Sequence, residues 1–314
     1  MAESGAANRP PLCGVVVAYH PSGDAVENLR AMVRECGSVV VVDNGSTEEA
    51  LAPLAGVAGA TILRLGANLG IATALNRGAE WARARGFGWC VAFDQDSRPV
   101  PGMIAAMWET HRRYPQAAIV APTIREAHAN PAGYCWVIPH SWIKGGFRRV
   151  RCAGADLDGV TMAISSGTLF ELETWSKLGG FDEALFIDYV DVDYCLRVLR
   201  AGRRIVVSAG AVLDHRLGNR WRVRFLGREI RPMGHAAFRH YYIARNRCRL
   251  WKRHALAVQH WALFDLCFAG YNTLRVLGFE PDKMRKLRAM IVGTWDGLRG
   301  RSGPCPAHWL RGGG

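Results

Sequence analysis

The sequence of 314 residues predicts an α/β fold in which helices flank a mostly parallel sheet, followed by a helical C-terminal region. The N-terminal part alternates short valine-rich runs with longer stretches whose apolar residues recur every three or four positions. Those runs are continuously apolar, as is typical of parallel strands covered on both faces. Beyond Trp221, basic amphipathic stretches replace the strands.

Strands and helices are expected to alternate from Leu12 onward. The expected strands are 12–18, 38–42, 61–65, 89–93, 117–121, 160–164, 203–208 and 211–213. The expected helices between them are 22–36, 48–54, 70–85 and 101–114. Strand and helix in this order and spacing indicate right-handed connections in a parallel sheet, so that the strands end at one edge. The segment 123–151 interrupts the pattern, and we expect a loop-rich or hairpin insertion whose basic residues face an acidic ligand or an acceptor.

Composition restricts the class of protein. Hydrophobic residues make up 49% and charged residues 21%, which is typical of a globular chain. The nine cysteines lie singly and favour a reduced interior over a disulfide framework. The first residues lack a secretory signal pattern, which predicts a cytoplasmic protein. A formal net charge of +13 calls for an acidic partner, and nucleic acid, anionic lipid or nucleotide phosphates would qualify.

Polar residues follow several predicted strands at the same edge. Asp94 and Asp96 follow the strand 89–93, and two carboxylates this close favour a divalent cation between them and a phosphate. The alternative is a solvated turn in which Asp96 caps the next helix. Asp43 is either a ligand of a ribose or base or part of a turn. Asn68 is either a helix cap or part of an anion site.

Further candidates lie in the second half of the chain. Ser166 belongs to a turn that presents hydroxyl and N–H groups. If residues 186–197 form a helix, Asp188 and Asp191 share a face, whereas Asp193 points away and pairs with Arg197. This leaves Asp191 as the candidate general base. His215 ends a predicted strand, as the carboxylates do, and could complete a metal site with Asp96.

The combination of motifs resembles the inverting family 2 glycosyltransferases of the GT-A fold, and most closely the bacterial rhamnosyltransferases, over about residues 12–300. The motifs are Val-Val-Val-Ala-Tyr-His-Pro (15–21), Val-Asp-Asn-Gly-Ser (42–46), Asn-x-Gly-Ile-Ala-x-Ala-x-Asn-x-Gly (68–78), Asp-Gln-Asp-Ser (94–97), Gly-Gly-Phe-Asp-Glu (179–183) and Phe-Ile-Asp-Tyr-Val-Asp (186–191). The resemblance implies a GT-A catalytic domain over 12–225, preceded by a disordered N-terminus at 1–11. A basic amphipathic helical region over 226–300 and a flexible tail at 301–314 follow.

The resemblance also implies roles for residues at matching positions. Asp191 is the expected catalytic base, although Val190 stands where many relatives carry a glutamate. Asp96 and His215 are the expected ligands of Mg²⁺ or Mn²⁺, which would stabilise the leaving nucleotide diphosphate. The expected nucleotide-sugar ligands are Tyr19, Asp43, Asn68, Asp94 and Gln95. The expected residues near the acceptor are Ser166, Asp188, Arg220 and Trp221.

The expected reaction transfers a sugar to a cell-envelope glycan or a lipid-linked acceptor. The favoured donor is dTDP-rhamnose, and a UDP-linked hexose or galactofuranose is the alternative. The basic amphipathic helices favour a peripheral position on the anionic inner face of the membrane. They would otherwise pack on the catalytic domain or join a second subunit. A nucleic-acid-binding protein is disfavoured because acidic residues cluster at one sheet edge and no recognisable binding motif is present. An oxidoreductase is disfavoured because G-x-G-x-x-G is missing after the first strand.

Overall fold

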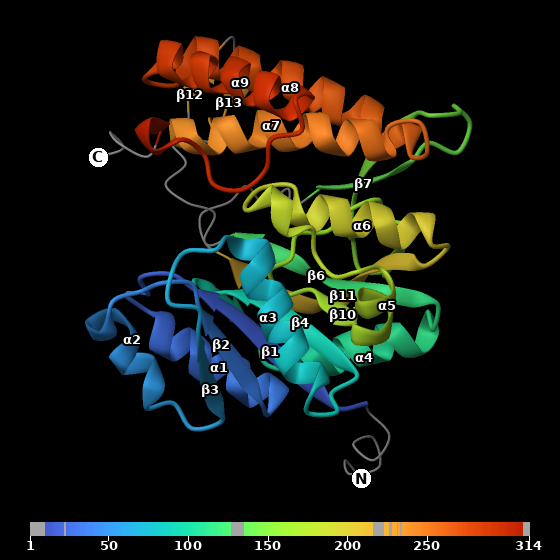
Figure 1. Cartoon of the computed structure of the whole chain (residues 1–314). Helices are drawn as coiled ribbons and strands as arrows, with labels where there is room; N and C mark the ends of the chain where they lie inside the picture. The colour runs from blue at the N-terminus through green and yellow to red at the C-terminus, as the bar shows by residue number, and fades with distance from the viewer. Residues whose placement is uncertain are drawn as a thin grey trace.

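The central element is a nine-stranded sheet, as the computed structural model shows (Figure 1). The structure describes residues 10–21, 23–126, 135–215, 223–225, 228–230, 232 and 234–309. The strand order is β3-β2-β1-β4-β10-β6-β11-β5, and β9 pairs with β11. The strands are β1 (Leu12–Ala18), β2 (Val39–Asp43), β3 (Ala60–Arg64), β4 (Trp89–Asp94), β5 (Ser97–Pro99), β6 (Ala117–Glu126), β9 (Leu157–Asp158), β10 (Leu169–Glu171) and β11 (Arg204–His215).

The parallel half of the sheet, β3-β2-β1-β4, forms as its apolar runs predict. Every residue of β2 is buried, because helices cover both faces of the sheet and leave no polar side. The other half is mixed. Strand β10 runs antiparallel to both β4 and β6, and β5 runs antiparallel to β11. The predicted fold class is therefore confirmed, with the antiparallel β10 between β4 and β6 and the antiparallel β5 beside β11.

Two helical layers sandwich this sheet. Apolar residues of α1, α2 and α4 pack on one face, and those of α3, α5 and α6 pack on the other. The helices are α1 (Ala25–Cys36), α2 (Glu48–Ala55), α3 (Ile71–Arg83), α4 (Met103–Arg113), α5 (Leu172–Lys177) and α6 (Val190–Arg200). The short 3-10 helix η1 (Glu183–Leu185) precedes α6. Each layer buries one apolar stripe per helix, which is the usual way for amphipathic helices to leave water.

Three long helices form a further layer beyond α6 (Figure 1). They are α7 (Ala237–His254), α8 (Gln259–Phe279) and α9 (Lys283–Leu298). Helices α7 and α9 approach closely because α9 carries glycine at the contact. A Cβ atom added at Gly293 would lie 2.3 Å from the carbonyl oxygen of Tyr241, so any larger residue there would force the helices apart. Within the described residues, none of the helices has the length and apolar character needed to cross a membrane.

Several local expectations differ from the structure. The segment 160–164 is no strand: the N–H of Val160 bonds to the carbonyl of Ile205, whereas that of Thr161 bonds to the carbonyl of Val137. These are isolated bonds to two different strands rather than a ladder. The two short strands expected at 203–208 and 211–213 are one strand, β11, with an irregularity after Ser208.

The basic insertion forms a hairpin of β7 (Cys135–Pro139) and β8 (Phe147–Arg151), which contacts α8. A second small hairpin consists of β12 (Val223–Phe225) and β13 (Arg228–Ile230). Residues 301–309 were expected to be flexible, yet they end in the 3-10 helix η2 (Ala307–Trp309). Their Cys305 and Trp309 are buried, because these side chains cover apolar parts of α7. Most of the predicted disordered N-terminus lies outside the described residues.

Candidate active site

The parallel strands bring two of the predicted carboxylates to one edge. Ala18 is the register partner of Asp43 on β2, and Val17 is the partner of Asp94 on β4. Asp43 is buried, and its Oδ1 accepts a hydrogen bond of 2.9 Å from the N–H of Ser46. The carboxylate therefore organises the turn after β2 as well as standing at the sheet edge.

Tyr19 and Gln95 hold the ends of β1 and β4 together. The N–H of Tyr19 donates to Oε1 of Gln95 at 2.8 Å, and Nε2 of Gln95 donates to the carbonyl of Tyr19 at 3.2 Å. The side-chain amide of Asn28 donates to the carbonyl of Gln95 at 3.2 Å. About half of the Tyr19 surface stays exposed (47%), so its ring is available to a ligand at this edge.

Asn68 shapes the entry to α3 without capping the helix. Its Oδ1 accepts hydrogen bonds of 3.1 Å from the N–H of Gly70 and from the amide of Asn44. The N-cap of α3 is Gly70, with a φ of 90°. A Cβ atom there would lie 2.7 Å from the carbonyl oxygen of Phe186, which accepts a 2.7 Å hydrogen bond from Ile71. Glycine is required because the loop before α6 lies against this turn.

Asp96 lies where β5 returns toward β11. Ser97 is the register partner of His215, so the backbone of the histidine runs beside the residue that follows Asp96. The Oγ atoms of Ser97 and Ser166 lie 2.5 Å apart, and the N–H of Asp94 donates to Oγ of Ser166 at 3.3 Å. Asp96 does not cap the next helix, because the N-cap of α4 is Gly102.

Two predicted residues and one side chain lie outside the described part of the chain. Arg220 and Trp221 are not described, and the same holds for the side chain of His215. Among the residues that the structure describes, no group of three or more histidine, cysteine or acidic side chains has an arrangement that would hold a metal ion.

Asp191 occupies the first turn of α6 and is partly buried. Burial raises the pKa of its carboxyl group to about 6, and the nearby negative charges of Asp188 and Asp94 add to this. The N–H of Val192, which donates to Oδ1 at 2.8 Å, acts in the opposite direction. Asp191 also lines a small cavity with mainly apolar walls, including Ala92. A carboxylate with such a pKa is suited to accept a proton near neutral pH.

Asp188 does not share a helix face with Asp191, because α6 begins only at Val190. It lies in the preceding loop with a φ of 61°. Its carboxylate forms a two-pronged ion pair with Arg239 of α7, with Nε 3.1 Å from Oδ2. Burial would lower the pKa of Arg239, but the charges of Asp188, Asp94 and Asp191 hold it above its usual value. Arg239 therefore joins these carboxylates in one electrostatic cluster.

The loop that carries Asp188 is conformationally strained and is held by α7. Three residues of this loop have positive φ although they are not glycine: Phe186 (65°), Asp188 (61°) and Tyr189 (66°). The side-chain amide of Asn246 donates to the carbonyls of residues 185, 187 and 188 at 2.9, 2.8 and 2.9 Å. The buried Arg245 donates to the carbonyl of residue 185 at 3.0 Å. These bonds supply hydrogen-bond donors to loop carbonyls that have no partner in a helix or strand.

Helix α8 fixes the end of the same loop. The hydroxyl of Tyr189 donates to Asp265 of α8, whose other oxygen accepts hydrogen bonds from Arg247 at 3.0 Å and Trp251 at 2.8 Å. The C-terminal helices therefore form part of the candidate active site. Sequence reasoning missed Arg239 and Asn246, since their polar character indicated only a cationic helix and nothing in the sequence connects them to residues 185–188.

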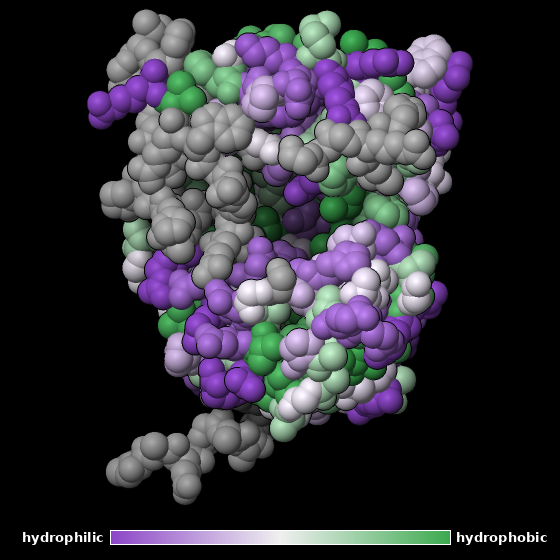
Figure 2. Space-filling view, turned by 90° about the vertical axis from the view of Figure 1, so that its left-hand side faces the viewer, coloured by the Kyte–Doolittle hydropathy of each residue, from purple (hydrophilic) through white to green (hydrophobic). Residues whose placement is uncertain are grey.

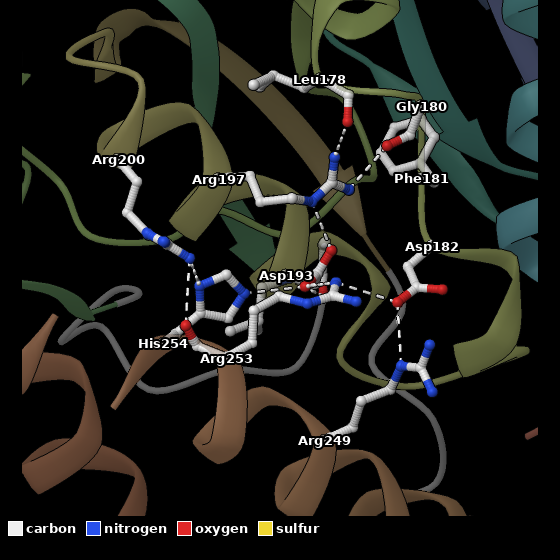
Figure 3. A network of polar contacts seen from close by, with 12 residues as sticks. Leu178, Gly180, Phe181, Asp182, Asp193, Arg197, Arg200, Arg249, Arg253 and His254 are labelled. Atoms are coloured by element: carbon white, nitrogen blue, oxygen red, sulfur yellow. Dashed lines mark hydrogen bonds and ion pairs between the residues drawn. The ribbon is translucent and has the colours of Figure 1, made fainter. Parts of the chain in front are cut away.

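Asp193 has the structural role that the sequence predicted, and its network is larger than expected (Figure 3). Its Oδ2 accepts a hydrogen bond of 2.7 Å from Arg197, and its Oδ1 accepts from Arg253 at 2.9 Å and His254 at 3.0 Å. Burial would raise the pKa of Asp193, but the His254 bond and the two arginines lower it to about 2. The network connects α6 to the end of α7.

A hollow lies between the sheet domain and the C-terminal helices, with polar and apolar side chains in its floor (Figure 2). A separate groove of about 1020 Å³ lies over α3, α5 and α6, with Asp182 and Arg253 in its walls. Among the described residues, none of the predicted site residues lines that groove. The carboxylate cluster with Arg239 is therefore the candidate active site.

Comparisons with known proteins bear on the family and the fold. Residues 25–171 match the glycosyl transferase family 2 domain. The chain is 29% identical to the dTDP-rhamnosyl transferase RfbF of Shigella flexneri over 298 residues, which cover 92% of this chain and 96% of that protein. It is 29% identical to the N-acetylglucosaminyl-diphospho-decaprenol L-rhamnosyltransferase of Mycobacterium tuberculosis over 57% of this chain and 66% of that protein.

The fold also has a counterpart among solved structures. A crystal structure of GalNAc-T7 with UDP, GalNAc and Mn²⁺ superposes with a TM-score of 0.56 at 14% identity, over 76% of this chain and 48% of that one. At this identity the likeness concerns the fold, which confirms the GT-A type of architecture. Taken together with the sheet topology, these similarities show that the chain contains a family 2 glycosyltransferase domain and is similar to rhamnosyltransferases.

Proposed function

We propose that the protein transfers L-rhamnose from dTDP-L-rhamnose to a glycan or lipid-linked acceptor, with inversion at the anomeric carbon. The choice of donor is supported by the similarity to a dTDP-rhamnosyl transferase over nearly the full length of both chains. The choice of acceptor is supported by the mycobacterial relative, whose name specifies a diphospho-decaprenol acceptor.

The observation that carries the proposal is the environment of Asp191. Its pKa of about 6 makes the carboxylate the main form at neutral pH and still basic enough to accept a proton. In the proposed reaction, Asp191 removes the proton of the acceptor hydroxyl while the oxygen attacks the anomeric carbon. The bond to the nucleotide diphosphate breaks on the opposite face, so a single displacement inverts the centre.

The donor would lie along the edge formed by the ends of β1, β2 and β4. Asp43 is proposed to contact the nucleotide, together with the exposed ring of Tyr19 and the amides of Asn68 and Gln95. The mutual hydrogen bonds of Tyr19 and Gln95 fix this edge before a ligand arrives. A prearranged site binds with a smaller loss of conformational entropy.

A divalent cation, Mg²⁺ or Mn²⁺, is proposed at Asp96 and His215, with Asp94 beside it. Two carboxylates separated by one residue supply hard oxygen donors, and the pairing of Ser97 with His215 brings the histidine backbone to them. The donor set therefore fits such an ion together with diphosphate oxygens. When bound, the ion would supply positive charge that stabilises the leaving diphosphate. The raised pKa of Asp191, caused mainly by burial and partly by Asp94, is consistent with a site of excess negative charge.

The acceptor is proposed to enter from the hollow near α7. Ser166 and Asp188 would lie on this side. Arg220 and Trp221, which lie outside the described residues, are proposed as further acceptor residues. We further propose that the enzyme works on the cytoplasmic face of the membrane, as a peripheral protein in cell-envelope polysaccharide synthesis, because a polyprenyl-linked acceptor is embedded there.

A ligand panel with a transfer assay tests the proposal. Thermal unfolding is measured with dTDP, UDP, GDP and their sugars, with and without Mn²⁺, since a ligand that binds the native state raises Tm. We expect the largest rise for dTDP-L-rhamnose with Mn²⁺, and release of dTDP when a polyprenyl-diphosphate-linked sugar is added. A clear preference for UDP sugars would overturn the donor assignment and keep the enzyme class.

A further inference from the structure

Helices α8 and α9 expose many large apolar side chains and bury several polar ones, which is unusual for helices at the surface of a globular protein. Helix α8 spans 21 residues, and its exposed side chains are almost all apolar. We define the outer face by the exposed large apolar residues of α8 and α9: Leu263, Leu266, Tyr271, Leu274, Leu277, Met284, Ile291, Trp295 and Leu298. Exposure reaches 67% at Leu274 and 70% at Ile291. Isolated exposed apolar residues are ordinary, but several on one side of a helix, most of them three or four positions apart, are typical of an interaction surface.

Several charged and polar residues of the same helices point inward. Asp265 and Asn272 of α8 are buried, and Asp265 binds Tyr189 of the loop before α6 and Arg247 of α7. In α9, Asp296 is buried and accepts a hydrogen bond of 2.7 Å from Tyr241. The inner side of these helices therefore packs within the protein, and the outer face is the side on which a partner could bind.

Charge distinguishes the partners that this face would suit. Of the four acidic residues between positions 259 and 299, only Asp282 is exposed. The exposed basic residues at the borders of the outer face are Lys283, Arg288 and Arg299. In a twofold dimer through this face, the same basic border would meet itself, with a single acidic residue per chain to compensate. An anionic lipid surface complements both the apolar centre and the basic border.

We propose that the outer face of α8 and α9 is a membrane-docking surface that binds anionic lipid headgroups and inserts its apolar side chains among them. Trp295 and Tyr271 are suited to the headgroup level, where aromatic residues with a polar atom are favoured. The helices lie on the bilayer and do not cross it, in agreement with the absence of a spanning helix in the described residues. That this docking serves catalysis rests on the proposed lipid-linked acceptor.

The location of the surface supports such a use. Helices α8 and α9 lie on the side of the helical layer away from the sheet, and α7 lies on the side that faces α6 (Figure 1). Arg239 and Asn246 on α7 contact that loop directly. Docking through the outer face would therefore hold the helical side of the active site close to the bilayer that contains the acceptor.

Vesicle flotation of the full-length protein tests the inference. Vesicles contain phosphatidylcholine alone or with about 30% phosphatidylglycerol, in about 0.1 M salt, where charge attraction still acts. We expect binding only to the anionic vesicles. The variants Leu274→Gln/Ile291→Gln and Lys283→Gln/Arg288→Gln/Arg299→Gln should each reduce the partition coefficient by about tenfold or more.

Matched controls change exposed residues that do not belong to the outer face. Trp142→Gln/Ile143→Gln changes two exposed apolar residues of the β7–β8 hairpin, and Arg30→Gln/Arg83→Gln/Arg85→Gln changes three exposed arginines of the sheet domain. Both should bind vesicles like the wild type. If the hairpin variant loses binding and the outer-face variants keep it, the inference is wrong.

Two further readouts separate the possible failures. Sedimentation velocity shows whether a second copy binds the outer face. The inference is overturned if the wild type is a dimer that does not bind vesicles and Leu274→Gln/Ile291→Gln is a monomer. The surface would then be a subunit interface. Binding of dTDP, followed by Tm, should be equal in all variants. If the protein binds vesicles but its Tm does not rise with any nucleotide sugar, the docking surface is supported and the proposed function is contradicted.

Discussion

The side-chain amide of Asn246 donates a hydrogen bond of 2.9 Å to the main-chain carbonyl of Asp188, three residues before Asp191. Asn246 belongs to a helix that follows the sheet domain, whereas Asp188 belongs to the loop with positive φ values that leads into α6. The C-terminal helices thus hold the backbone that places the candidate base. Strain of this kind persists only where the surroundings fix it.

The first prediction concerns this contact. Asn246→Ala removes the donor of the carbonyls of residues 187 and 188, while the carbonyl of residue 185 keeps its bond from Arg245, so the free energy of unfolding should fall by about 2–4 kcal/mol. The loop should relax and kcat should fall at least tenfold at a temperature where the variant is folded. Chemical denaturation and the transfer assay measure both quantities. The control is Leu250→Ala on the same helix, a buried truncation with a similar expected cost of about 2–5 kcal/mol. Equal losses of kcat in both variants would assign the effect to stability alone.

The second prediction concerns Arg239. Its positive charge favours the ionised form of Asp191, so Arg239→Gln should raise the pKa of Asp191 and move the acidic limb of the kcat/KM profile to higher pH. Arg239→Lys should keep the limb near its wild-type position because it keeps the charge. Both should lose about 10–100-fold in rate, since lysine cannot form the two-pronged contact with Asp188.

A control variant separates this effect from a general loss of positive charge. Arg249→Gln removes an arginine of the same helix that pairs with Asp182 at 3.1 Å. Its pH profile should match that of the wild type. An unchanged profile in Arg239→Gln would contradict the electrostatic role of Arg239.

The third prediction concerns the buried network of Asp193. Asp193→Asn leaves Arg197, Arg253 and His254 without their common anion, which should cost about 3–5 kcal/mol of stability at pH 7. The pKa of Asp193 is lowered to about 2, so its contribution is complete above pH 4 and is lost as the pH falls toward 2. The stability difference from the wild type should narrow over that interval. Glu173→Gln, in an exposed pair with Lys177, should leave stability close to that of the wild type, because solvent screens the pair.

The fourth prediction separates stability from function at Asp191. Because burial raises the pKa of this acid to about 6, its neutral form favours the fold and that contribution is lost as the pH rises through 6. Asp191→Asn should therefore stabilise the protein by about 1–2 kcal/mol at pH 8, after allowance for partial exposure, and by little at about pH 3.5, below the unfolded pKa of 3.8. Calorimetry at the two pH values measures the difference. A lower Tm for the variant at pH 8 would show that the ionised carboxylate stabilises the fold.

The sheet and its polar edge were predictable because the relevant signals are local. The four consecutive valines of β2 indicate a strand buried on both faces, and the register then places Asp43 beside the end of β1. Asp94 follows from the same argument. The positions of the two carboxylates along the sheet edge therefore needed no tertiary information.

The surroundings of Asp191 required tertiary contacts. A helix starting near residue 186 satisfies the apolar pattern, yet Asn246 and Arg239 hold residues 185–188 in another conformation, so α6 starts later. The bond of Thr161 to Val137 likewise keeps an apolar segment out of the sheet. In both places, a partner distant in the sequence overrides the local preference.

The proposed mechanism depends most directly on Asp191 as the base. The test measures two properties of the Asp191→Asn variant: the acceptor-dependent release of dTDP from dTDP-L-rhamnose, and the affinity for dTDP. The amide keeps the size of the side chain and cannot accept the proton, so kcat should fall by about 10²–10⁴-fold while Kd for dTDP stays within about twofold. Transfer at a rate close to that of the wild type would contradict the assignment of Asp191 and, with it, the proposed mechanism.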